Sequence, residues 1–188
     1  AYQLHQEMQR QYLYYEAELI HPVDMAFKVE TLDYLLPNEK EFILGLSLFH
    51  DQRYETALNH LSMVCHLDMD AMIVYMLTLD KLEHKELIIK LKDNMEFINQ
   101  SNDAKVLYQH LICKYSDDKS DILHYLRTCI LGVGMITHHY HILEYLMIDS
   151  QKLFAKYQYY KEATQVVQEI HPKLKSLKKA QQCLILET

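Results

Sequence analysis

Apolar and polar residues follow one another along this chain with the period of helices. Leu4, Met8, Tyr12 and Tyr15 form a stripe that runs to about residue 19, because side chains three or four residues apart share one face of a helix. Similar stripes recur to the end of the chain, and no stretch has the period of a strand. The predicted helices span about 4–19, 24–36, 38–50, 54–66, 70–80, 85–98, 102–115, 120–131, 137–157, 160–170 and 172–188.

Short polar segments separate these helices. His21 precedes Pro22 and ends the first helix, since the residue before a proline is pushed away from helical backbone angles. With three glycines and three prolines in 188 residues, the chain favours long helices joined by short turns. Asn102 is the predicted N-cap of the helix that it opens. The predicted turns lie at 51–53, 82–84, 99–101, 116–119 and 157–159.

Two stretches share a more specific spacing. The first contains Leu44, Gly45, Tyr54, Ala57 and Leu61, and the second repeats its last three members as Tyr160, Ala163 and Val167. Ala57 and Ala163 are 106 residues apart, close to three periods of about 34 residues. This distance leaves room for four helical hairpins.

The spacing resembles the tetratricopeptide family over 38–68 and 138–171, and more weakly over 70–133. In that family a Leu-Gly pair lets the two helices of a hairpin pack closely, and the alanine seats the second helix. The resemblance implies an all-α fold: a right-handed α-solenoid of about four hairpins at 37–171, after N-terminal helices at 1–36 and before a C-terminal capping helix at 172–188. Glu41 and Gln151 depart from the pattern, which expects an aromatic residue and a glycine there.

The low-Gly, Tyr-rich and Ile-rich repeats also resemble the sensing domains of peptide-responsive regulators of Gram-positive bacteria and their phages, such as quorum-sensing transcription factors, Rap phosphatases and arbitrium receptors. The resemblance implies a peptide-binding sensor domain of an intracellular signalling or transcription regulator, with no catalytic activity and no cofactor. Ala1 opens directly into a helical pattern, so we expect the C-terminal part of a longer protein, in which another domain makes any contact with nucleic acid. The alternative is a constitutive scaffold that docks a folded partner.

In tetratricopeptide stacks the first helix of each hairpin lines the concave side, and this predicts a peptide groove. Lys152 and Lys156 are expected to hold a peptide carboxylate, and Asp80 a basic side chain. The predicted groove residues are Phe42, Leu46, Phe49, His50, Met72, Met76, Asp80, Leu107, Leu111, Tyr115, Tyr145, Ile148, Lys152 and Lys156. Glu39, Phe42 and Leu46 argue against a clamp for chaperone tails, because they stand where such a clamp needs Lys, Asn and Arg.

Methionines at 63, 69, 72 and 76 are concentrated in one region. Methionine adapts to varied neighbours, so this cluster either lines the groove or fills the core of a hairpin. The fifteen tyrosines suit a binding surface, and the composition of the genome is the competing explanation.

The net charge, the cysteine spacing and the length of apolar runs limit the classes of protein to which the chain can belong. The net charge of −7 argues against wrapping of nucleic acid, since that needs clustered Lys and Arg, and the one basic stretch, Lys173–Lys179, is short. Cysteines at 65, 113, 129 and 183 show no paired spacing and indicate free thiols in a cytoplasmic protein. No apolar run reaches the length of a membrane span.

The residues that could bind a metal or act in catalysis lack the spacing and motifs that such sites need. His138, His139 and His141 lack the spacing of four residues that points two imidazoles to one side of a helix, so no metal site is predicted. Asp68 and Asp70 lie in a predicted turn, where solvated acids are ordinary, and no nucleophile motif is present. The final helix carries Leu174, Leu177, Leu184 and Ile185, which predicts self-association, with a homodimer as the expected state.

Overall fold

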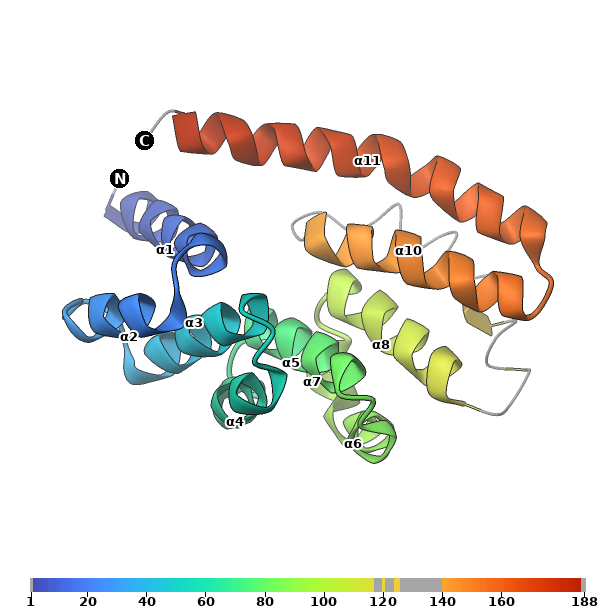
Figure 1. Cartoon of the computed structure of the whole chain (residues 1–188), viewed down its shortest axis with the longest axis horizontal. Coiled ribbons are helices and arrows are strands. Elements are labelled where there is room, and N and C mark those ends of the chain that lie inside the picture. Colours follow the sequence, from blue (N-terminus) through green and yellow to red (C-terminus); the bar gives the residue numbers. More distant parts are fainter. Residues whose placement is uncertain (1, 117–119, 121–123, 126–139, 187–188) are drawn as a thin grey trace. The chain divides into compact units, whose positions relative to one another are not determined.

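A computed structural model describes residues 2–116, 120, 124–125 and 140–186, and helices are the only regular elements among them (Figure 1). The prediction of an all-α chain is therefore confirmed. The elements are α1 (Tyr2–Leu19), α2 (Pro22–Glu30), α3 (Pro37–His50), α4 (Tyr54–Val64), α5 (Met69–Lys81), α6 (Lys85–Lys90), the 3-10 helix η1 (Leu91–Asn94), α7 (Met95–Ile98), α8 (Asn102–Tyr115), α10 (Tyr140–Lys156) and α11 (Tyr160–Leu186).

The chain divides into two compact units, Ala1–Leu87 and Ile88–Thr188. In the first, α3 and α4 form a helical hairpin against which α1, α2 and α5 pack. Ala57 and Leu61 of α4 are fully buried, and a side chain at Gly45 of α3 would overlap Leu61. The predicted role of Gly45 in the close packing of this hairpin is confirmed. The core around it contains Leu13, Ala17, Met25, Val29, Leu35, Phe42, Ile43, Leu46, Leu48 and Val64.

Three turns between helices share one backbone conformation. Their middle residues, Gln52, Glu83 and Gln158, have φ angles of 61°, 54° and 64°, in the left-handed region. The next residue in each turn donates its N–H to the carbonyl five residues before it, which is the Schellman arrangement. These bonds are Arg53 to Leu48, His84 to Leu79 and Tyr159 to Phe154. The turns predicted at 51–53, 82–84 and 157–159 are confirmed.

In the second unit, α10 and α11 form a hairpin, and α8 packs against α10. The buried stripe of α11 consists of Val166, Ile170 and Leu174, at intervals of four residues. On the facing helix, Leu146, Leu153 and Phe154 are buried. This alternation of buried and exposed positions is the helical period on which the sequence prediction was based.

Three helices begin at regular intervals along the chain. Pro37 opens α3, Met69 opens α5 and Asn102 opens α8, so the starts are 32 and 33 residues apart. This interval is close to the 34 residues of tetratricopeptide repeats. The regular spacing of helix starts thus extends over the weakly matching region as well.

Several predicted boundaries are wrong. Pro172 lies inside α11, where a break was expected, because the buried stripe continues across it and offsets the lost backbone hydrogen bond. The helix expected to reach residue 36 ends at Glu30: Leu35 stays buried in a non-helical turn and so prolongs the apolar pattern. Ser101, and not Asn102, is the N-cap of α8, and its hydroxyl accepts a hydrogen bond from the Ala104 N–H.

The helix expected at 85–98 is divided into α6, η1 and α7. Ile88, Leu91 and Ile98 are buried and keep the apolar period, whereas Asp93 and Asn94 are poor helix formers at the point of interruption. The turn at 99–101 is as predicted. The helix expected at 120–131 and most of the turn at 116–119 lie outside the described residues. Cys65 and Cys113 carry free thiols, as expected.

Candidate functional site

Half of the side chains expected to line a peptide groove are buried within their own unit. They are Phe42, Leu46, Met72, Met76, Asp80, Leu107 and Leu111. In this arrangement they hold helices together and present no surface to a ligand. For Met72 and Met76 the core explanation of the methionine cluster therefore holds, whereas Met63 is exposed.

The other half are accessible to different degrees. Phe49, His50, Tyr115 and Tyr145 are half-buried, and Ile148, Lys152 and Lys156 are exposed. Phe49 makes edge-on contacts with His50 and Tyr54, with ring centroids 5.6 Å and 5.5 Å apart. The ammonium of Lys156 lies over the ring of Tyr157, 5.5 Å from its centroid.

The accessible residues of α10 form one stripe. Ile148, Lys152 and Lys156 follow one another at intervals of four residues, and Tyr145 lies one turn before Ile148 on the same side. Ile148 is 49% exposed, although it is a large apolar residue. Lys152 makes no ion pair within the part of the chain that the structure describes. The three exposed residues thus lie together on the solvent side of this helix, with the half-buried Tyr145 at their N-terminal end.

Behind this stripe, a network of polar side chains joins α8 to α10. One carboxylate oxygen of Asp149 accepts hydrogen bonds from His110 Nε2 at 2.9 Å, Lys114 Nζ at 2.9 Å and the Tyr145 hydroxyl at 3.3 Å. His110 Nδ1 lies 2.8 Å from the hydroxyl of Tyr125, which lies 2.8 Å from Ser150 Oγ. The His110 ring also packs edge-on against Tyr145, with centroids 5.5 Å apart.

The hydrogen bonds of this network follow from its chemistry. A carboxylate only accepts, so the Nε2 atom of His110 carries a hydrogen and donates it to Asp149. Partial burial alone raises the pKa of Asp149, but the hydrogen bonds from His110 and Lys114 outweigh it and hold that pKa well below its usual range. Asp149 is therefore a carboxylate anchored by three donors.

The side chains of this network are buried or half-buried. His110, Tyr125 and Ser150 are buried, and the side chain of Asp149 is 19% exposed. A buried polar group is costly unless its partners are in place, so this complete set fixes the register of α8 on α10. It thereby holds the start of the exposed stripe, because the Tyr145 hydroxyl binds the same oxygen.

Sequence reasoning missed this network. The available signal was a polar residue in an apolar stripe: His110 stands between Val106, Leu107 and Leu111, all buried, and such a residue needs a partner. His110 is eight residues after the first residue of α8, as Gly45 is after the first residue of α3. The pairs His110–Tyr125 and Gly45–Leu61 thus begin at the same position of their helices and span 15 and 16 residues.

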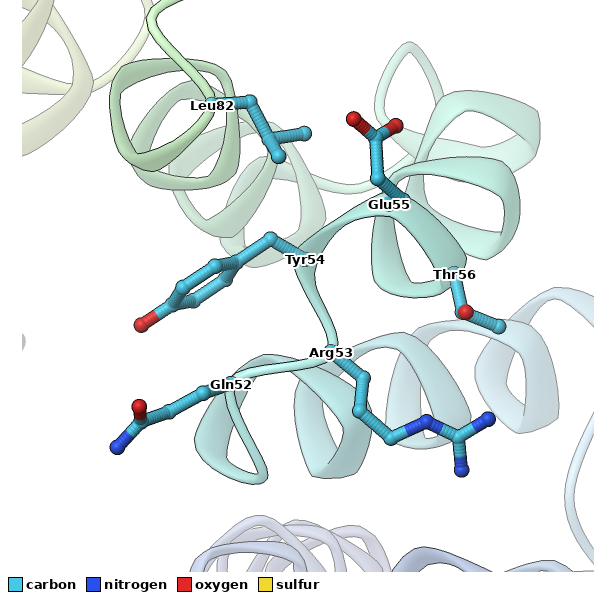
Figure 2. A pocket seen from close by; sticks show the side chains of 6 residues that line it. All are labelled: Gln52, Arg53, Tyr54, Glu55, Thr56 and Leu82. Carbon is cyan, nitrogen blue, oxygen red and sulfur yellow. The ribbon is translucent and has the colours of Figure 1, made fainter.

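A shallow hollow of about 340 Å³ lies beside the turn between α3 and α4. Figure 2 shows that Tyr54 and Arg53 project in opposite directions there and do not converge on one point. Binding sites for small molecules combine an enclosed shape with converging polar groups. This hollow is open and carries no such set. Its lining residues are Gln52, Arg53, Tyr54, Glu55, Thr56 and Leu82.

Two other kinds of site were sought. No group of three His, Cys, Asp or Glu residues that could hold a metal ion occurs in the described ranges. His138 and His139 lie outside them, as does the side chain of His141. Among the helices that the structure describes, none combines the length and the apolar character needed to cross a bilayer. A search of protein-family models, curated proteins and solved structures finds no match to this chain.

Proposed function

We propose that the chain is a peptide-binding sensor domain of an intracellular signalling or transcription regulator, built as a solenoid of tetratricopeptide-like hairpins. Three features support the repeat: the regular starts of α3, α5 and α8, the shared turn conformation, and the matching pairs Gly45–Leu61 and His110–Tyr125. Stacked hairpins offer an extended surface for a linear peptide.

The stripe on α10 is the observation that carries the binding proposal. It combines an exposed aliphatic side chain, Ile148, with the ring edge of Tyr145 and the cation of Lys152. A short peptide anchors an apolar side chain on the first two, and its carboxylate binds Lys152 through a charge-assisted hydrogen bond.

Binding acts on the rest of a regulator through the repeats. Each repeat of a solenoid contacts only its neighbours, so a ligand that bridges repeats sums small rotations into a change of curvature. The proposal is that an attached DNA-binding or effector domain responds to this change.

Calorimetry with a library of peptides of about five to ten residues tests the proposal. We expect a hit to bind with a free carboxylate and to weaken when that carboxylate is amidated. Lys152→Glu should weaken the hit by about 1–3 kcal/mol, since attraction becomes repulsion. Lys161→Glu, which changes an exposed lysine of α11, is the matched control and should leave binding unchanged.

The alternative function is a scaffold that docks a folded protein. If no peptide binds, and cross-linking instead captures a folded protein whose contact survives Lys152→Glu, the chain docks a folded partner and the sensor proposal is wrong.

A further inference from the structure

The outer face of α2 is apolar in the middle. Val23 is 61% exposed and Phe27 is 73% exposed, and they lie one helical turn apart on the same side. The opposite side of the helix is buried through Pro22, Met25 and Val29. The helix thus has two apolar faces, and its packing in the first unit covers only one.

Carboxylates border this exposed face on both sides. With 100° between successive residues, Asp24 lies about 60° to one side of Phe27 and Glu30 about 60° to the other. Both carboxylates are exposed, and neither takes part in an ion pair or side-chain hydrogen bond within the described ranges. The only lysine of the helix, Lys28, is bound to Glu16 and does not neutralise them.

We propose that this face of α2 docks an amphipathic helix of a partner protein, with an apolar stripe that covers Val23 and Phe27 and with Lys or Arg beside it. An exposed phenylalanine is a typical anchor of an interface, and unpaired carboxylates at its rim select a basic partner. The same carboxylates repel phosphate-rich surfaces, so nucleic acid and anionic membranes are disfavoured. This surface is separate from the stripe on α10 and does not depend on the peptide proposal.

A second copy of the chain fits this face less well. Its own basic stretch, Lys173–Lys179, supplies the charge, but Leu174 is buried within its unit and Lys178 is bound to Glu144. The buried Leu174 is thus not available to cover Phe27 beside that charge. A partner helix that carries an exposed apolar stripe with Lys or Arg beside it matches this face of α2 in both shape and charge.

Fluorescence anisotropy of the full chain with labelled synthetic peptides tests the proposal. The probe is an amphipathic Leu/Lys helix of about five turns. Its two controls are a Leu/Glu peptide with the same stripe and a Leu/Lys peptide of shuffled order. We expect the ordered Leu/Lys peptide to bind at least about tenfold more tightly than either control.

Substitutions locate the site. Phe27→Ser and Glu30→Lys should each weaken the Leu/Lys peptide by about tenfold. The matched controls are Met63→Ser and Glu55→Lys, which change an exposed apolar residue and an exposed acid of α4 and should leave binding unchanged. Glu30→Lys keeps the test valid if Phe27→Ser alters the thermal midpoint.

Three results overturn the proposal: equal binding of the Leu/Glu or shuffled peptide, no effect of either α2 substitution, or a dimer in sedimentation that Phe27→Ser converts to a monomer. The last result assigns the face to a second copy. Lys152→Glu should not affect the Leu/Lys peptide, so failure here and failure of the peptide proposal are separate outcomes.

Discussion

Gly45 of α3 lies so close to Leu61 of α4 that a Cβ atom on residue 45 would be 2.7 Å from Leu61 Cγ and 2.8 Å from Cδ2. Leu61 is fully buried in the core of the first unit. The absence of a side chain at residue 45 is therefore a requirement of the hairpin and not only a gain in backbone freedom.

Gly45→Ala should destabilise the chain by about 1–3 kcal/mol through overpacking, although alanine is the better helix former by about 1 kcal/mol. Urea unfolding followed by circular dichroism measures the change. The double variant with Leu61→Ala should show a favourable coupling, because the smaller residue removes the overlap. A stabilising Gly45→Ala would contradict the packing described for this hairpin.

The three left-handed turn residues give a second prediction. Gln52, Glu83 and Gln158 carry side chains in a conformation that costs a non-glycine residue about 1 kcal/mol or more. Replacing any of them with glycine should stabilise the chain by about 0.5–1 kcal/mol. Asp51→Gly is the control: residue 51 has a φ angle of −76°, so glycine should destabilise there.

Much of the fold was predictable because apolar residues recur along the chain with the period of a helix. Helices α1, α3, α5 and α8 end within about two residues of their predicted ends, and the Gly45–Leu61 contact follows from local spacing. The period fails where buried residues continue outside a helix, as Leu35 does after α2. It also fails at Pro172, where burial on both sides outweighs a local break signal.

The candidate site was less predictable, since it depends on long-range contacts. The expectation that the first helix of each hairpin lines the groove does not distinguish buried from exposed side chains. It therefore assigned the buried Met72 and Leu107 to the same groove as the exposed Lys152. The Asp149 network joins residues 39 positions apart, and no local pattern pairs His110 with Asp149. Exposure of Val23 and Phe27 likewise depends on which face of α2 meets α3.

A third prediction concerns the two alanines of the repeat. Ala57 is fully buried, whereas Ala163 of α11 is only half-buried. Ala57→Leu should therefore cost about 1–3 kcal/mol through overpacking, and Ala163→Leu clearly less. Thermal unfolding of both variants gives the comparison. Equal losses would mean that the α10–α11 hairpin is packed as tightly as α3–α4.

The last prediction concerns pH. The pKa of Asp149 is lower in the folded chain than in the unfolded chain, where it is about 3.9. As the pH falls, the unfolded chain takes up this proton first, so the stabilisation from Asp149 is complete above about pH 5 and is lost progressively below it. Asp149→Asn should cost about 1–3 kcal/mol at pH 7, because Lys114 and His110 lose a charged acceptor.

The same variant should flatten the acid dependence of the free energy of unfolding, since residue 149 no longer titrates. Urea unfolding at intervals from pH 7 down to pH 3 measures both effects. Glu169→Gln, which removes an exposed acid from α11, is the matched control and should leave the slope unchanged. If Asp149→Asn kept the full acid dependence, the pKa of Asp149 would not be lowered in the folded chain.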